Sequence, residues 1–385
     1  MLLKKFTAII LSLLILVSAC VFPIYAESRD DGVALDLNCK SAILMEAETG
    51  KVLYEQNADE AMAPASVTKI MTLLLVMEAV DEGKIKFDDI VTTSAHAASM
   101  GGSQIYLKEG EQMSVEDMVK SVVIASANDA ACALAEHVSG SEAAFVKRMN
   151  ERASELGMEN TNFENTNGLD DTATNHLTSA RDIAIMSREL ISHKKILEYS
   201  SVWMDTIRDG LFGLTNTNRL VRFYRGCTGL KTGSTAKAGF CISATAERDG
   251  MSLICVIMGS ESRDARNAAA ANLLDWGFAN YGVYKLSGEQ IDNIKVLGGV
   301  SNKVSAKFDD FSYVTEKSNI SKIESQTVLP EAVSAPVKQG EVIGEVVFKL
   351  GDNVIGKTDI YATSDIEKIS FFELMYRILA KFLLK

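Results

Sequence analysis

Residues 64–80, Pro-Ala-Ser-Val-Thr-Lys-Ile-Met-Thr-Leu-Leu-Leu-Val-Met-Glu-Ala-Val, are the stretch that decides the fold. From Ser66 to about Glu82 the sequence has no helix breaker, and it follows Pro64, a residue favoured where helices begin. It therefore predicts a helix with Ser66 in its first turn. Lys69 lies three residues further on, so its amine and the Ser66 hydroxyl share one helix face. A neutral amine placed there can accept the hydroxyl proton, which would make the serine a nucleophile.

The sequence on either side of this helix predicts the rest of an α/β (α+β) domain, which we place at residues 35–282. Two short apolar runs around Gly50 precede the helix and predict a β-hairpin, whereas helical periodicity dominates residues 114–193 and is broken by a polar loop. Strands then return, joined by a hairpin turn, and a helix closes the domain. This order predicts one sheet whose first and last strands pair across a helical insertion. The predicted segments are 41–45 and 51–54 (hairpin), 160–168 (loop), 226–233, 240–247 and 251–258 (strands) and 262–281 (helix).

Two further segments follow that domain. Residues 283–363 lose the helical signals and show short alternating runs with Gly340 and Gly351 at turns, which predicts a small β-sandwich domain. Residues 366–385 predict an amphipathic helix, with phenylalanine and leucine on one face and mostly basic side chains on the other. Such a helix suits the surface of a membrane, although its apolar face could instead pack on the β-domain or on a partner chain.

Composition narrows the compartment and the class of partner. The formal charge of −12 offers no basic surface for phosphates, so nucleic acid is not an expected partner. Residues 1–26 have a lysine-rich start, an apolar run and a small residue at Ala26, which predicts a signal peptide and an exported chain at the outer face of the cytoplasmic membrane or in the cell wall. Cys20 lies in a lipobox-like context, so lipidation is the alternative. The cysteines and histidines show no metal-ligand spacing, and we expect neither a metal nor a cofactor.

Ser-x-x-Lys alone is a weak signal, because Ser192 to Lys195 and Ser234 to Lys237 match it as well. Two more motifs strengthen it. Ser126-Ala127-Asn128 precedes a helix, where the serine can relay protons to a leaving nitrogen and the asparagine amide can orient a peptide.

The second of these motifs is Lys231-Thr232-Gly233, which ends a predicted strand. There a lysine and a threonine hydroxyl can bind a substrate carboxylate, while the glycine admits the substrate backbone.

In this order the three motifs resemble those of penicillin-binding proteins and class A β-lactamases. Further segments, including Thr49 to Leu53, Gly101 to Ser103, Asn167 to Leu169 and Ala335 to Gly340, are similar to the low-molecular-mass D-alanyl-D-alanine carboxypeptidases of the penicillin-binding protein 5 type. The resemblance runs from about residue 35 to the end of the chain. It implies a serine-type carboxypeptidase that removes the terminal D-alanine of peptidoglycan stem peptides and that β-lactam antibiotics inhibit covalently.

The resemblance also implies a role for each site residue. Ser66 would form the acyl-enzyme with Lys69 as general base, Ser126 and Asn128 would assist, and Lys231 with Thr232 would hold the terminal carboxylate. The oxyanion hole would be the N–H groups of Ser66 and Ser234. Ser234 replaces a histidine that is frequent in the family, which affects the fine-tuning of substrate binding rather than catalysis.

Three alternatives stay open. A β-lactamase shares the three motifs, but the chain has no Glu-x-x-Leu-Asn of the kind that class A enzymes use. A D,D-endopeptidase cannot be separated from a carboxypeptidase by sequence. A non-catalytic penicillin-binding protein would be free to lose one of the motif residues, and all are present. We interpret His176 as a structural hydrogen-bonding residue rather than as an acid or base.

Overall fold

The computed structural model describes residues 35–171 and 173–383, and residues from Leu37 onward form one compact unit. The predicted signal peptide and Cys20 lie outside the described residues.

A five-stranded antiparallel sheet in the order β2-β1-β9-β8-β7 organises the first part of the chain. The register runs from Ser41 opposite Met258 to Glu46 opposite Leu253, so the first strand pairs with one that follows more than 200 residues later. This confirms the prediction of a sheet closed across a helical insertion. The strands are β1 (Ser41–Glu46), β2 (Val52–Gln56), β7 (Cys227–Thr235), β8 (Gly239–Arg248) and β9 (Met251–Ser260).

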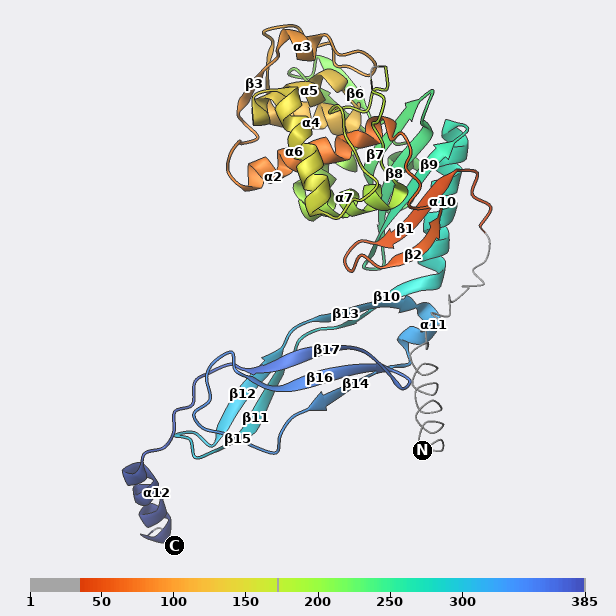
Figure 1. Ribbon diagram of the computed structural model, residues 1–385. Helices are drawn as coiled ribbons and strands as arrows, with labels where there is room; N and C mark the ends of the chain where they lie inside the picture. Colours follow the sequence, from red (N-terminus) through yellow and green to blue (C-terminus); the bar gives the residue numbers. More distant parts are fainter. Residues whose placement is uncertain (1–34, 172, 384–385) are drawn as a thin grey trace, which may run out of the picture. The chain divides into compact units, whose positions relative to one another are not determined.

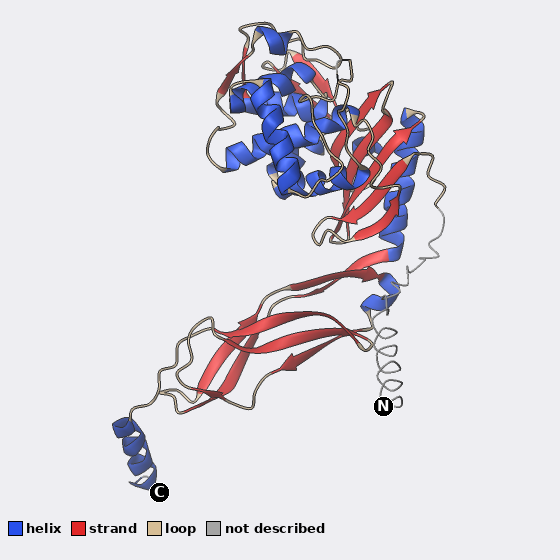
Figure 2. Ribbon diagram, in the orientation of Figure 1, coloured by secondary structure: helices blue, strands red, loops and turns tan. Residues whose placement is uncertain are grey.

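Helices cover both faces of this sheet, with α10 on one side and the helical insertion on the other (Figures 1 and 2). Several begin after a serine whose hydroxyl accepts a backbone N–H, as Ser114 does from Asp117 at 3.1 Å, which caps the helix. The helices are α2 (Lys69–Asp81), α3 (Ala95–Ala98), α4 (Val115–Ile124), α5 (Asn128–Ser139), α6 (Glu142–Glu155), α7 (Ala180–Ser192), α8 (Lys195–Ser200), α9 (Leu220–Phe223) and α10 (Arg263–Asn280). Two small hairpins, β3 (Ile90–Thr92) with β4 (Gln112–Ser114) and β5 (Met204–Ile207) with β6 (Phe212–Thr215), complete this part.

Helix α2 is buried on almost every side, which explains why its sequence is apolar without a polar face. Its start differs from the prediction. The α-helix begins at Lys69, and Ser66 lies in the preceding 3-10 turn η1 (Ala65–Thr68). Ala65, directly before the serine, has a φ of 50°, a backbone conformation that no α-helix contains.

Strands dominate the chain after α10, as predicted. A two-stranded sheet faces a six-stranded sheet in the order β14-β16-β17-β12-β11-β15, and the stacked rings of Phe311 and Phe348, 3.7 Å apart, join them. The strands are β10 (Tyr281–Leu286) with β13 (Phe311–Glu316), then β11 (Gln290–Leu297), β12 (Lys303–Phe308), β14 (Ile323–Val328), β15 (Val333–Ser334), β16 (Val342–Leu350) and β17 (Asn353–Ala362). One short helix, α11 (Lys317–Ile320), is an exception that the sequence analysis did not predict.

The last described element is helix α12 (Phe371–Leu383), which is amphipathic and has no buried residue. It begins five residues later than expected, because Ile366 belongs to the β-domain, where it is buried and bridges to Val337. Within the described residues, no helix combines the length and the apolar character that crossing a membrane requires.

Candidate active site

Ser66 and Lys69 form the hydrogen-bonded pair that their spacing predicts. The Lys69 Nζ lies 2.9 Å from the Ser66 Oγ and also donates to the backbone oxygen of Asn167 at 2.8 Å. The lysine side chain is fully buried. The loop that carries Asn167 packs tightly on the serine turn, because a Cβ on Gly168 would lie 1.8 Å from the Ala65 oxygen.

A second buried lysine reaches the Ser126-Ala127-Asn128 motif. Lys231, from β7, donates from its Nζ to the Ser126 Oγ at 2.9 Å across 105 residues of sequence. Ser126 has a φ of 63°, a left-handed conformation that is costly for a residue other than glycine and is common at functional sites. The structure therefore joins two motifs that the sequence presents separately.

Burial and mutual repulsion act on the two lysines. Burial, and after it the positive charge of Lys231, hold the pKa of Lys69 well below its usual range, although the Asp129 carboxylate acts in the opposite direction. Burial, and then the Arg266 guanidinium, lower the pKa of Lys231 to about 7. Both effects disfavour the charged ammonium. For Lys69 they favour the neutral amine, which is the form that can accept a proton.

Asn128 begins helix α5, and its amide has a fixed orientation. Its Nδ2 donates to the Gly101 oxygen at 2.7 Å, whereas its buried Oδ1 has no hydrogen-bond partner within the described structure. Asp129 ties the same loop down by accepting the backbone N–H groups of Ile105 and Leu107. The unpartnered oxygen is an acceptor that is available to a substrate N–H.

Thr232 and Gly233, from the Lys-Thr-Gly motif, form one edge of an open cavity of about 560 Å³. Ser66, Ser126, Thr232, Gly233 and Ser234 all line it. Gly233 also packs against the serine turn, because a Cβ there would lie 2.7 Å from the Ser66 nitrogen. It allows strand β7 to approach the serine turn itself, and not only a substrate.

Sequence reasoning missed several residues of this cavity. Thr217 accepts a hydrogen bond from the Thr232 hydroxyl at 2.8 Å, and Arg266 is buried beside Lys231 with its pKa lowered to about 10, mainly by burial. Arg219 and Arg263 also line the cavity, which gives it a cationic wall. None of these belongs to a recognisable motif. A cationic wall beside Lys231 attracts a carboxylate.

The Ser192–Lys195 pair differs from the first. Ser192 donates to the Glu189 oxygen, and Lys195 pairs with Glu198 at 2.7 Å on the surface. Neither residue faces the cavity. This match therefore lies away from the cavity.

His176 is a structural residue, as predicted. Its Nδ1 accepts the Glu164 N–H at 3.0 Å, so in the neutral ring the proton is on Nε2, which contacts the Thr68 hydroxyl at 2.8 Å. Burial lowers its pKa to about 4, which keeps the ring neutral at physiological pH. It supports the serine turn from behind, because the Thr68 hydroxyl donates to the Ala65 oxygen.

A serine paired with a buried lysine amine, beside a second lysine and an unpartnered amide oxygen, is an arrangement suited to serine acyl transfer. Comparisons with known proteins agree with this class. A family model described as D-alanyl-D-alanine carboxypeptidase matches residues 27–262, and one described as penicillin-binding protein 5, C-terminal domain, matches residues 283–368. The chain belongs to the D-alanyl-D-alanine carboxypeptidase family, peptidase family S11, and is a serine-type hydrolase.

Individual relatives span almost the whole chain. It is 41% identical over 376 residues to D-alanyl-D-alanine carboxypeptidase DacF of Bacillus subtilis. The matched region covers 95% of this chain and 96% of that protein. DacA of Haemophilus influenzae is 33% identical, with 92% of each chain covered. The crystal structure of penicillin-binding protein 5 from Haemophilus influenzae matches with a TM-score of 0.73 and 32% identity, over 87% of this chain and 99% of that one.

Proposed function

We propose that this protein cleaves the amide between two terminal D-alanines of a peptidoglycan stem peptide and releases the last one. The observation that carries the proposal is the 2.9 Å contact between the Ser66 Oγ and the Nζ of the fully buried Lys69. The names of the relatives point to the same substrate.

In the acylation step the Ser66 hydroxyl loses its proton to the Lys69 amine while its oxygen forms a bond to the amide carbon. The negative charge that develops on the carbonyl oxygen is stabilised by the backbone N–H groups of Ser66 and Ser234, both of which line the cavity. When the C–N bond breaks, the leaving nitrogen takes a proton from Ser126, which Lys231 contacts at 2.9 Å. The proton that Lys69 took from Ser66 replaces the one that Ser126 lost, so that Lys69 is neutral again.

Substrate binding uses the remaining residues. The unpartnered Asn128 Oδ1 accepts an N–H of the peptide, and Lys231 with Thr232 holds the terminal carboxylate at the cationic wall. Gly233 keeps the strand close to the nucleophile. Water then attacks the ester and its proton passes to Lys69. Lys69 returns this proton to the Ser66 oxygen as the ester bond breaks, which restores the free enzyme.

The direct test measures free D-alanine from a peptide that ends in D-Ala-D-Ala. We expect release by the wild type, none by Ser66→Ala, and unchanged release by Ser192→Ala, the matched serine of a surface Ser-x-x-Lys pair. Release by Ser66→Ala at the wild-type rate would refute the proposal.

β-Lactams are proposed as covalent inhibitors that acylate Ser66. Penicillin-binding protein D2 of Listeria monocytogenes, 34% identical over 64% of this chain, has been solved in its ampicillin-bound and cefotaxime-bound forms. We expect labelled penicillin to attach once per wild-type chain and not to Ser66→Ala. Rapid penicillin hydrolysis without D-alanine release would indicate a β-lactamase instead.

We also propose that the chain is exported, loses residues 1–26, and lies at the membrane through α12. The division into domains at residues 35–282 and 283–363, followed by α12 as a separate helix, is part of this proposal. Large apolar side chains of α12 are exposed, Phe372 at 78% and Phe382 at 80%, which suits insertion at a lipid surface.

Vesicles of anionic phospholipid test the membrane proposal. Two proteins are compared, one that ends at Lys385 and one that ends at Ser370. Both begin at residue 27, so that the apolar N-terminal segment does not contribute. We expect the longer chain to sediment with the vesicles and a chain ending at Ser370 to stay in solution with full D-alanine release. Equal sedimentation of the two would refute the role of α12.

A further inference from the structure

Glu142, the first residue of helix α6, lies outside the catalytic motifs and makes three hydrogen bonds. Its Oε1 accepts the backbone N–H of Thr166 at 3.1 Å and the Thr166 hydroxyl at 2.7 Å, and its Oε2 pairs with the His96 Nε2 at 2.7 Å. Thr166 is fully buried. The carboxylate therefore holds the backbone and the side chain of one buried loop residue at the same time.

That loop residue precedes the one that touches the proposed general base. The Thr166 oxygen accepts the Thr72 hydroxyl at 2.6 Å, so every polar group of Thr166 is engaged. The next carbonyl, that of Asn167, accepts the Lys69 Nζ at 2.8 Å. The hydrogen bonds of Glu142 to Thr166 and the peptide bond from Thr166 to Asn167 thus connect Glu142 to the carbonyl that the Lys69 side chain contacts.

The Asn167 carbonyl matters for the geometry of proton transfer. A neutral amine has two N–H donors and one lone pair, and the lone pair must point at the Ser66 hydroxyl to take its proton. One N–H held by the Asn167 oxygen restricts rotation of the amine and keeps the lone pair aimed. A loop that shifts by a few tenths of an ångström would misdirect it.

The same loop cannot relax toward the serine turn. A Cβ on Gly168 would lie 1.8 Å from the Ala65 oxygen and 2.7 Å from the Thr68 hydroxyl oxygen, so the backbone is already in close contact there. With one side closed, the anchor on the other side sets the position of the Asn167 carbonyl. Glu142 is the charged anchor there, and it acts beside the Thr72 hydroxyl and the Asn165 side chain.

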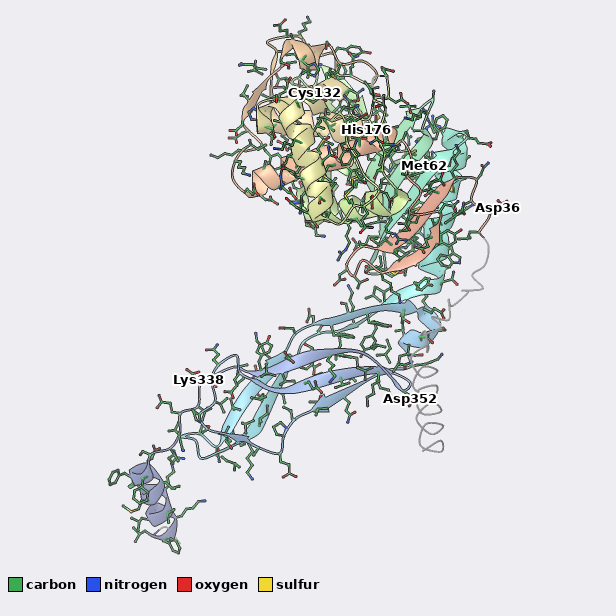
Figure 3. All side chains as sticks on the ribbon, in the orientation of Figure 1. Asp36, Met62, Cys132, His176, Lys338 and Asp352 are labelled. Carbon is green, nitrogen blue, oxygen red and sulfur yellow. The ribbon has the colours of Figure 1, made fainter. Side chains whose placement is uncertain are left out.

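His96, Cys132 and Glu142 also bring metal-binding atom types within 4.8 Å of one another. Cys132 lies within the helical part of the molecule (Figure 3) and is fully buried. Both oxygens of Glu142 are, however, already engaged by Thr166 and His96. The hydrogen-bond network accounts for the cluster without an ion.

We propose that Glu142 is a positioning residue for acylation: through Thr166 it fixes the Asn167 carbonyl that orients the Lys69 amine. This inference rests on the proposed function of Ser66 and Lys69. It concerns the rate of serine acylation and not the binding of substrate, because Glu142 does not line the cavity.

The test compares Glu142→Ala with Glu142→Gln, whose amide oxygen can still accept from Thr166. Glu151→Ala is the matched control, since Glu151 is exposed on the same helix and only approaches Lys147 and Arg148 at 3.8–3.9 Å. Stopped-flow acylation by labelled penicillin gives the limiting rate constant and the half-saturating concentration, and final labelling gives the fraction of active protein.

We expect Glu142→Ala to lower the limiting acylation rate constant by about 10-fold or more, with final labelling and half-saturating concentration unchanged. Glu142→Gln and Glu151→Ala should stay within about threefold of the wild type. Thr166→Val, which removes only the hydroxyl, serves if Glu142→Ala does not fold, and should slow acylation about threefold to 10-fold.

Three results would overturn the proposal: acylation by Glu142→Ala at the wild-type rate, an equal loss in Glu142→Gln, or a loss confined to the fraction labelled. Failure of the proposed function is distinguishable, because then the wild type itself would release no D-alanine and Ser66→Ala would label as well as the wild type.

Discussion

Gly233→Ala tests how closely strand β7 must approach the nucleophile. The added Cβ would lie 2.7 Å from the Ser66 nitrogen and 2.9 Å from both the Pro64 oxygen and the Val67 nitrogen. All three are backbone atoms of the serine turn, so no flexible side chain can move aside. The φ of Gly233 is not in the left-handed region, which leaves steric contact as the effect of the substitution.

The magnitude follows from these distances. Ordinary contact begins near 3.4 Å, so the strand and the turn must separate by roughly 0.5 to 0.7 Å. Misplacement by about 1 Å can cost 10²-fold in rate, so we expect the acylation rate constant to fall by about 10-fold to 100-fold. Overpacking of this kind costs about 1–3 kcal/mol in the free energy of unfolding.

The assay is acylation by labelled penicillin, with urea unfolding measured in parallel. Gly213→Ala is the matched control, because Gly213 lies in strand β6 with no atom within 4 Å of its added Cβ. We expect this variant to match the wild type in both measurements. If Gly233→Ala also acylates at the wild-type rate, the close approach of strand and turn is not what the chemistry needs, and the reasoning fails.

Three further variants test the lowered pKa values of Lys231 and His176 and the side-chain amide of Asn128. Between pH 7 and 10.5 the unfolded chain binds a proton that native Lys231 does not, so wild-type stability should rise with pH there; in urea unfolding, Lys231→Met should lack this rise and should release no D-alanine. Between pH 6.5 and 4 the unfolded chain protonates at a histidine that stays neutral when native, so wild-type stability should fall by on the order of 3 kcal/mol. His176→Gln should flatten that loss, and an unchanged slope would contradict the assignment. Asn128→Ala removes the unpartnered acceptor and should lower kcat/KM for the peptide by about 5-fold to 100-fold, whereas unchanged kcat/KM would exclude that contact.

The elements that the sequence predicted well carry strong local signals. Strands β8 and β9 are apolar runs joined at Asp249 and Gly250, both with positive φ, which is the conformation that a tight hairpin turn needs. The start of α2 was misplaced because propensity extends the helix back to Ser66, whereas Ser66 lies in a 3-10 turn that packs closely on Gly233 of strand β7. Local preference gave way there to tertiary contact.

The site was predictable only where motifs mark it. Ser66, Ser126 and Lys231 were proposed because their residue types repeat a known spacing. The Ser66–Lys69 hydrogen bond is local, whereas the one between Ser126 and Lys231 depends on a fold that brings them together across 105 residues. The Asn167 carbonyl could not be found from the sequence, because every residue carries the same backbone oxygen. Thr217 is one of many threonines, and only its position marks it.

Lys69, Lys231 and Arg266 are three buried cations whose pKa values are all lowered. Burial is the main cause that lowers the pKa of all three; in addition, Arg266 lowers the pKa of Lys231, and Lys231 lowers that of Lys69. In the proposed mechanism the free site therefore keeps Lys69 neutral, which is the state that can accept a proton. A bound carboxylate at Lys231 and Thr232 would offset part of this positive field and make the Lys69 amine a stronger base when the peptide is in place. Binding of the terminal carboxylate and activation of Ser66 are then coupled through charge, and this coupling favours peptides that end in a free carboxylate over those that do not.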